Sequence, residues 1–128
     1  MRPIKFKFWN NKLKKMSKVH GLGIIYEHLS EEWDGFDWED VEKLQFTGLL
    51  DRSGKEIYEG DVVKGNLIKY SPLPIMGEVV WDNELSGFAS KNNAGNTLLF
   101  EIDQIRIIGD KFQNPELLNH GPEGLKGG

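Results

Sequence analysis

A period-two alternation of apolar and polar residues opens the chain. Two sets of side chains alternate between residues 4 and 9, namely Ile4, Phe6 and Phe8 on one face and Lys5, Lys7 and Trp9 on the other. This alternation predicts a half-buried strand. Asn10 and Asn11 follow, and because Asn tolerates the left-handed conformation, they predict a turn that leads the chain back through Leu13 and Met16.

The pattern is least regular between residues 19 and 44. Residues 19–26 are apolar enough for another strand, although Gly21 and Gly23 weaken it. Residues 27–44 form an acid-rich excursion that we expect to be exposed. Within this excursion, Asp37 is placed to cap a short helix whose apolar residues follow at regular spacing, at Trp38, Val41 and Leu44.

The segment 45–64 predicts two strands around a tight turn, followed by a corner. Asp51 can accept hydrogen bonds from nearby backbone N–H groups, and Gly54 can adopt a positive φ without a Cβ clash, so a hairpin turn is expected there. A structural corner then follows, made of Glu59, Gly60 and Asp61. Such a break suits the sharp strand corners of small barrels.

Closely spaced strands with turn residues between them fill most of the remaining chain. We expect these strands at residues 65–70, 77–81, 87–90, 97–100 and 105–108. Pro72 and Pro74 exclude a central strand position and predict a loop at the sheet edge. Asn114 and Pro115 begin a short helix, and residues 119–128 carry too few apolar side chains to fold alone.

Together these elements predict a mainly β fold. It is a β-rich α+β fold, with a small barrel-like antiparallel sheet, an N-terminal hairpin and one or two short helices. The length of 128 residues suits one domain with a sizeable core, which we place at residues 1–120. It begins with an N-terminal hairpin region at 1–26, continues with an acidic excursion at 27–44 and ends with a barrel-like part at 45–118. We expect residues 119–128 to form a flexible tail.

The net charge of −4 conceals a separation of charge along the chain. Seven positive residues occur among the first eighteen, and eight acids lie between residues 27 and 42 without a Lys or Arg among them. The simpler interpretation is two solvated surfaces that partly neutralise each other. The alternative is a nucleic-acid face or a steering patch.

Composition excludes several classes of protein. The chain contains no Cys, so it has no disulfide framework, thiol nucleophile or Cys-ligated zinc site, which fits a reducing compartment. No stretch approaches the ~20 apolar residues that a membrane-spanning helix requires. We therefore expect a cytoplasmic protein without a membrane partner.

Four segments carry a resemblance to a known family. They are IKFKFWNNKLKKM from residue 4, QFTGLLDRSGKEIYEGDVVK from residue 45, GEVVWDNELSGF from residue 77 and IRIIGDKFQNPELL from residue 105. In these segments the chain resembles the YopX family of small bacteriophage and prophage proteins, most specifically in TGLLDRSGKEIYEGD. The resemblance implies a phage or prophage origin, the cytoplasm of a bacterial host, and a mainly β fold with a barrel-like C-terminal part. It implies no established biochemical activity.

The sequence offers little chemistry. It has no Walker-type Gly-Lys loop, GxSxG elbow or HExxH motif, and its histidines His20, His28 and His120 lie far apart. We interpret Glu59 and Asp61 as shaping the corner at Gly60, with Asp61 accepting backbone N–H bonds and Glu59 facing water, rather than as an acid–base pair. We therefore expect no enzyme activity, no catalytic residue, no metal site and no cofactor.

Two functional hypotheses remain. The first is a protein-interaction or assembly module that contacts another protein, or a second copy in a homo-oligomer, through the aromatic residues Trp33, Phe36 and Trp38. The alternative is a nucleic-acid-binding accessory protein with a basic hairpin on which a base stacks. That hairpin would use Lys5, Lys7, Trp9, Lys12, Lys14 and Lys15. The acidic total, with a pI near 5.4, favours the first hypothesis.

Overall fold

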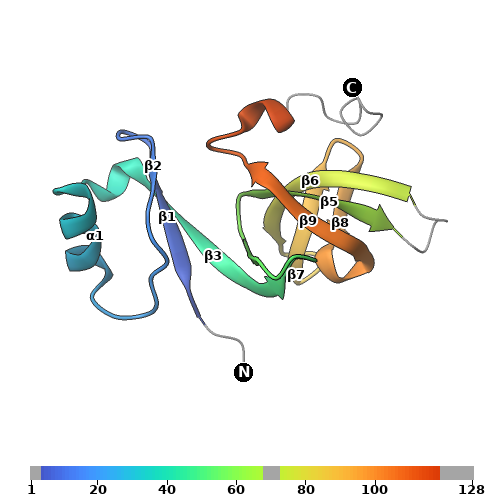
Figure 1. Ribbon diagram of the computed structural model, residues 1–128, viewed down its shortest axis with the longest axis horizontal. Helices are drawn as coiled ribbons and strands as arrows, with labels where there is room; N and C mark the ends of the chain where they lie inside the picture. Colours follow the sequence, from blue (N-terminus) through green and yellow to red (C-terminus); the bar gives the residue numbers. More distant parts are fainter. Residues whose placement is uncertain (1–3, 68–72, 119–128) are drawn as a thin grey trace.

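Two antiparallel sheets joined by one long strand make up the computed structural model, which describes residues 4–67 and 73–118. Figure 1 shows the smaller sheet and its helix at one end of the molecule and the larger, curled sheet at the other. The long strand β3 (Val41–Leu50) runs from the first towards the second. This arrangement confirms the predicted fold class.

The smaller sheet contains the predicted N-terminal hairpin. Its strand order is β2-β1-β3-β4, with β1 at Phe6–Asn10, β2 at Lys15–Met16 and β4 at Glu56–Tyr58. The Asn10 side chain accepts hydrogen bonds from the backbone N–H groups of Lys12 and Leu13, at 3.0 and 2.9 Å, and so shapes the turn. The first half of β3 pairs with β1 and its second half pairs with β4, so β3 connects the N-terminal hairpin to β4.

The strand predicted at residues 19–26 is wrong, since helix α1 (Ile25–Trp33) begins within it. Ile25, Leu29 and Trp33 are spaced four residues apart and therefore share one helix face, where Leu29 and Trp33 are buried. They pack on Phe6 and Phe8 of β1. The acidic excursion is consequently anchored by its own apolar face rather than exposed throughout.

Asp37 caps a helix as predicted, although the helix is only one turn long. Its carboxylate accepts a hydrogen bond from the backbone N–H of Glu39 at 3.0 Å, at the start of the 3-10 helix η1 (Trp38–Asp40). Val41 and Leu44 were expected on that helix but lie on β3, because pairing with β1 begins directly at Val41.

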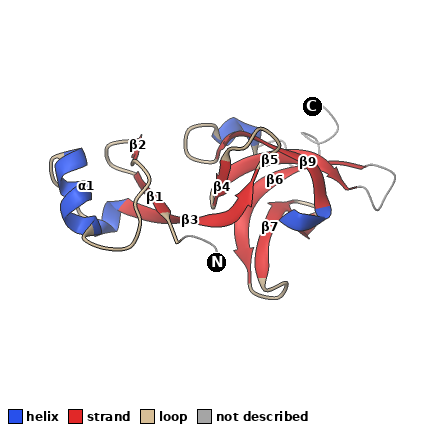
Figure 2. Ribbon diagram, turned by 60° about the horizontal axis from the view of Figure 1, so that its bottom comes forward, coloured by secondary structure: helices blue, strands red, loops and turns tan. Residues whose placement is uncertain are grey.

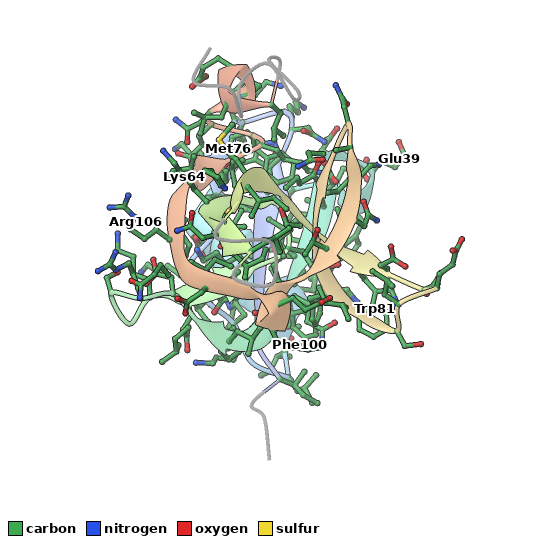
Figure 3. The ribbon with its side chains drawn as sticks, turned by 90° about the vertical axis from the view of Figure 1, so that its right-hand side faces the viewer. Glu39, Lys64, Met76, Trp81, Phe100 and Arg106 are labelled. Atoms are coloured by element: carbon green, nitrogen blue, oxygen red, sulfur yellow. The ribbon has the colours of Figure 1, made fainter. Side chains whose placement is uncertain are left out.

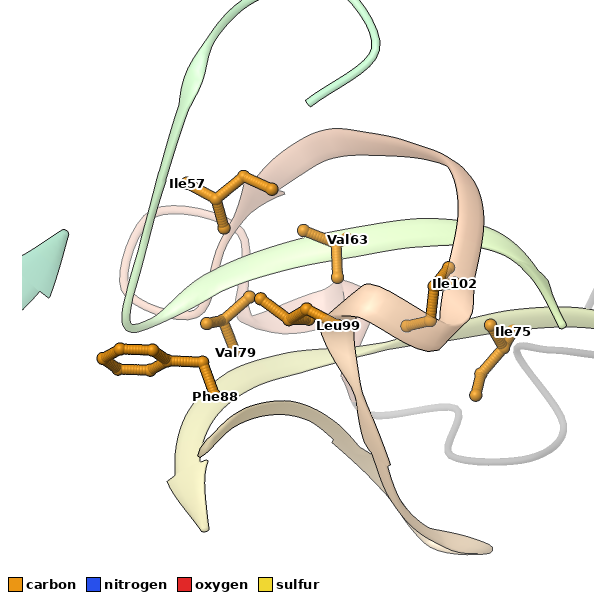
Figure 4. Close-up of a cluster of buried hydrophobic side chains, with 7 residues drawn as sticks. All are labelled: Ile57, Val63, Ile75, Val79, Phe88, Leu99 and Ile102. Carbon is orange, nitrogen blue, oxygen red and sulfur yellow. The ribbon is translucent and has the colours of Figure 1, made fainter. Parts of the chain in front are cut away.

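The larger sheet has five strands in the order β8-β7-β6-β5-β9. Figure 2 shows that it is curled into a half-barrel. The strands are β5 (Asp61–Leu67), β6 (Leu73–Asp82), β7 (Gly87–Asn92), β8 (Gly95–Leu98) and β9 (Ile102–Asp110). Figure 4 shows the buried cluster inside it, to which β4 of the smaller sheet contributes Ile57. The two sheets therefore share a core.

Glycines allow neighbouring strands to approach closely at two points of the half-barrel. A Cβ added to Gly65 on β5 would lie 2.4 Å from Ile102 Cγ2, and one added to Gly77 on β6 would lie 2.4 Å from Ser90 Oγ. Real Cβ atoms do not come this close to neighbours, so both positions need glycine for packing.

Several boundaries differ from the predicted strands. Leu99 and Phe100 lie in the 3-10 helix η3 (Leu99–Glu101) rather than in a strand, and this turn carries the chain from β8 across to β9. Pro74 lies on β6, not in a loop, but it pairs only with β5, since the pairing of β6 with β7 begins at Glu78. The predicted short helix is confirmed as η4 (Pro115–Leu117). Pro72 and the tail at 119–128 lie outside the described residues.

Candidate functional sites

The structural corner has the geometry that the sequence predicts at Gly60 and Asp61. Gly60 has φ +87°, and Asp61 Oδ2 accepts the backbone N–H of Tyr58 at 2.8 Å. Glu59 does not simply face water, because its Oε1 accepts the backbone N–H of Gln45 at 2.8 Å. Its own backbone N–H donates to Gln45 O at 3.0 Å, so Glu59 continues the β3–β4 pairing beyond the end of β4.

A cleft of about 420 Å³ opens beside this corner, between the two sheets. We call it the junction cleft, and its lining residues are Lys7, Val19, Lys55, Glu56, Tyr58, Asp61, Ile107, Gly109 and Asp110. Lys7 Nζ lies 4.5 Å from the centre of the Tyr58 ring, and the Tyr58 hydroxyl donates to Glu56 Oε1 at 3.0 Å. Residues far apart in sequence thus form one polar site.

The acidic groups of the junction cleft have distinct electrostatic environments. Burial raises the pKa of Asp61 to about 6, although the Tyr58 N–H and the Lys7 charge act in the opposite direction. The hydrogen bond from Lys5 lowers the pKa of Glu56. Burial together with the neighbouring Glu56 carboxylate raises the pKa of Tyr58. Of Asp61, Glu56 and Tyr58, it is therefore Asp61 that titrates nearest to neutral pH.

The structure does not bring the predicted nucleic-acid residues together on a free face. Lys5 forms an ion pair with Glu56, and Lys7 lies over Tyr58. Trp9 is 5% exposed and stacks on Phe112, with ring centroids 5.1 Å apart. The remaining members are exposed around the hairpin turn, at Lys12, Lys14 and Lys15.

The three predicted interaction aromatics have different environments. Trp33 is 7% exposed and belongs to the core beneath α1, so it is not available to a partner. Phe36 is half-buried, and its ring centre lies 4.8 Å from that of Trp38. Trp38 is 48% exposed.

Tyr26, which was not among the predicted interaction aromatics, completes an aromatic surface. It is 53% exposed, and its ring centre lies 5.1 Å from that of Phe36 and 6.2 Å from that of Trp38. The signal that could have identified it is the helical period of α1, which sets Tyr26 off the buried face of Ile25 and Leu29. We call Tyr26, Phe36 and Trp38, with the acids between residues 27 and 42, the acidic aromatic surface.

A groove of about 380 Å³ lies next to this surface. Its lining residues are Asn10, Lys12, Leu13, Trp33, Asp34, Gly35, Phe36, Asp37 and Asp40. In the part of the chain that the structure describes, Asp34, Asp37 and Asp40 take part in no ion pair. Negative charge and aromatic area therefore occur together at this end of the molecule.

Two more large aromatic side chains are exposed on the half-barrel. Figure 3 shows Trp81 and Phe100 on the outside of the curled sheet, where they are 48% and 77% exposed. Each has only two acids just after it in the sequence, Asp82 and Glu84 for Trp81 and Glu101 and Asp103 for Phe100. Among residues 4–67 and 73–118 there is no group of three or more His, Asp or Glu side chains placed to hold a metal ion. None of the helices described there is long and apolar enough to cross a membrane.

Comparison with known proteins agrees with the fold. The family model described as YopX protein matches residues 5–119. Among solved structures, the crystal structure of protein EF1440 from Enterococcus faecalis is similar, with a TM-score of 0.56 and 23% sequence identity. The similarity covers 91% of this chain and 98% of that chain, and it shows a shared fold. A comparison with curated proteins gives no match.

Proposed function

The chain belongs to the YopX protein family, and from this premise we propose that it is a non-enzymatic interaction module that binds a basic surface of another protein. We place it, as a phage or prophage protein, in the cytoplasm of the bacterial host. The acidic aromatic surface is the observation that carries this proposal. It offers large apolar area at one end of the fold, together with Asp34, Asp37 and Asp40, which form no ion pair within the described residues.

The aromatic part of this surface suits a binding hot spot. Trp and Tyr are enriched among the residues that dominate interface energies, because their large rings bury much area at low entropic cost. Tyr26 and Trp38 are each about half exposed, yet Phe36 contacts both and holds them in place. A partner would therefore meet a pre-organised apolar patch.

The charge on this surface selects the class of partner. Residues 19–42 contain eight acids and no Lys or Arg, so a basic protein surface is the electrostatic complement. Complementary charge mainly speeds association and orients the partner, while the buried aromatic area supplies most of the affinity. Binding should accordingly weaken as ionic strength rises.

Capture of a partner from host extract, followed by affinity measurement with the purified partner, tests this proposal. Trp38→Ala should weaken binding by about tenfold or more, the usual loss for an interface hot spot. Trp81→Ala is the matched control because Trp81 is equally exposed, at 48%, but lies on the half-barrel. It should bind like the wild type. An equal loss of affinity in Trp38→Ala and Trp81→Ala would contradict the proposal.

Stability measurements distinguish the surface from the core beneath it. Trp33→Ala should lower the free energy of unfolding by ~3–5 kcal/mol, since it empties a buried aromatic position. Trp38→Ala should lower the free energy of unfolding much less than Trp33→Ala does, while it weakens association with the partner. If Trp38→Ala lowers stability strongly and leaves association unchanged, the surface belongs to the chain's own core. Light scattering shows whether the partner is instead a second copy.

The nucleic-acid alternative has less support than the interaction proposal. It needs Lys5, Lys7 and Trp9, whose side chains are already engaged with Glu56, Tyr58 and Phe112. The exposed lysines of the hairpin turn remain available to phosphates. Binding of labelled single- and double-stranded DNA and RNA, measured at low and at moderate salt, tests this alternative, because phosphate contacts give a steep salt dependence.

A further inference from the structure

The floor of the junction cleft holds a buried carboxylate whose charge is not paired. Asp61 is only 7% exposed, and its Oδ2 accepts one hydrogen bond, from the backbone N–H of Tyr58. Within the described residues, no Lys, Arg or His nitrogen forms an ion pair with it. A buried charge without a counter-ion is costly, so the position favours a cation that reaches it from the cleft.

The other acids of the cleft are already engaged. Glu56 pairs with Lys5 and accepts from the Tyr58 hydroxyl. Asp110 accepts from the backbone N–H groups of Phe112 and Gln113 and from the Gln113 side chain. Asp61 is therefore the carboxylate of this cleft that is left to bind a ligand.

The walls suit an apolar stem attached to the cation. Val19 and Ile107 contribute aliphatic side chains, Tyr58 contributes an aromatic ring, and Gly109 leaves backbone exposed to the cleft. With a volume of about 420 Å³, the cleft has room for a small organic group. Sites for small molecules combine apolar surface with placed polar groups, and here the three apolar surfaces lie among five charged lining residues.

We propose that the junction cleft binds an organic cation, an alkylammonium or alkylguanidinium group, which pairs with the Asp61 carboxylate while its stem lies against Val19, Ile107 and Tyr58. The cation can come from a free small molecule or from a Lys or Arg side chain of another protein. This site is separate from the acidic aromatic surface and stands independently of it.

Titration of the protein with n-butylguanidinium at pH 8, followed by backbone amide NMR, tests the site. Saturable shifts are expected at Ile107 and Gly109, whereas the neutral isostere n-butylurea should give none. Asp61→Asn keeps an acceptor for the Tyr58 N–H and should abolish binding. Glu84→Gln removes the same charge from an exposed turn outside the cleft and should leave binding unchanged.

The pH dependence in the wild type gives a test that needs no variant. Affinity should fall about tenfold between pH 8 and pH 5 as Asp61 takes up a proton. Asp61 is faced by charged or titratable groups from β1, the β3–β4 turn, β4 and β9, namely Lys7, Asp51, Lys55, Glu56, Tyr58 and Asp110. Lys7→Met removes a positive charge that acts on Asp61 and would compete with the bound cation, so it should tighten binding severalfold at pH 8.

A blocked Gly-Arg-Gly peptide distinguishes the two sources of the cation. Tighter binding of the peptide than of n-butylguanidinium would assign the cleft to a protein side chain, and tighter binding of the small cation would assign it to a free molecule. No amide shifts with either probe, equal shifts with n-butylurea, or affinity independent of pH would overturn the proposal.

Discussion

Gly60, at the corner between β4 and β5, hydrogen-bonds to both sides of the half-barrel chain around it. Its N–H donates to Val79 O of β6, and its carbonyl accepts from the N–H of Lys111 just after β9, both at 2.9 Å. At φ +87° only glycine is free of backbone strain, and an added Cβ would lie 3.1 Å from the Phe112 ring. One glycine therefore allows the corner, the hydrogen bonds and the ring packing together.

Gly60→Val is expected to lower the free energy of unfolding by about 1–3 kcal/mol through backbone strain, with a further loss from the contact with Phe112. Chemical denaturation measures this change. Gly54→Val is the matched control for the contact with Phe112. Gly54 has a similar φ of +90°, so the backbone strain is comparable, but nothing lies within 4 Å of an added Cβ. An unchanged midpoint for Gly60→Val would show that the corner tolerates a side chain.

Two aspartates on either side of β4 show how local donors decide the charge state of a residue. Burial raises the pKa of Asp51, but hydrogen bonds from the N–H groups of Lys55, Ser53 and Ile107 and from the Ser53 hydroxyl outweigh it, so the pKa falls to about 2. Asp61 accepts only one such bond, and burial prevails. Asp51 is therefore a fixed structural anion, whereas Asp61 is free to exchange a proton near neutral pH.

Among the elements, the β3–β4 turn fastens the smaller sheet to the edge of β9. Arg52 N donates to Ile105 O at 2.8 Å, and Ile107 N donates to Asp51 Oδ2 at 3.1 Å. These bonds use backbone groups that β9 would otherwise present at a free sheet edge. The turn therefore both reverses the chain and attaches the smaller sheet to β9.

Asp51→Asn should destabilise the protein by about 1–3 kcal/mol at pH 7, because the amide cannot satisfy both the turn and the Ile107 N–H. The folded-state pKa of Asp51 is about 2, below its ordinary value of 3.8, so the stability that this carboxylate contributes is complete above about pH 4 and is lost as the pH falls towards 2. Urea denaturation between pH 2 and pH 7 should show the difference from wild type shrinking over that window.

Asp103→Asn serves as the control for this titration. Asp103 is exposed on β9 and makes no side-chain hydrogen bond within the described part of the chain. Its substitution should change stability by less than about 0.5 kcal/mol at any pH. A difference between wild type and Asp51→Asn that stays constant from pH 7 to pH 2 would contradict the proposed role of the carboxylate.

At the scale of the whole molecule, contacts around Lys111 and Phe112 join the two sheets into one body. Phe112 stacks on Trp9 of β1, with ring planes 20° apart. Lys111 Nζ lies 3.8 Å from Glu42 on β3 and 3.3 Å from Glu78 on β6. Exposed ion pairs contribute little to stability, so we expect the stack of Phe112 on Trp9 to supply most of the energy that holds the two sheets together.

Phe112→Ala should lower the free energy of unfolding by roughly 2 kcal/mol, less than for a fully buried Phe because the ring is half-buried. Amide hydrogen exchange should show protection falling in β1 and in β9 together, since the stack joins them. Phe100→Ala, at a ring that is 77% exposed, should have little effect. Loss of protection in β1 alone would show that the sheets unfold separately.

Local signals made much of the fold predictable. The turn chemistry at Asp51 and Gly54 and the glycine of the corner each act within a few residues, and each is found where expected. The alternation at residues 4–9 correctly predicted a strand, although Ile4 is half exposed and Trp9 is buried. Helix α1 was not predicted, because its apolar residues are buried by packing on Phe6 and Phe8, which lie far away in the sequence. The acid-rich composition of this segment hid its single apolar face.

The sequence by itself determined the family, the mainly β class and the corner at Gly60, since turns, alternation and glycine conformations are properties of neighbouring residues. Tertiary structure alone decided which aromatics face outward, separating buried Trp33 from exposed Trp38 and Tyr26. It also decided that Lys7, Tyr58, Asp61 and Ile107 meet in one cleft. These groups come from different strands, and their encounter depends on how two sheets pack, which no local pattern encodes.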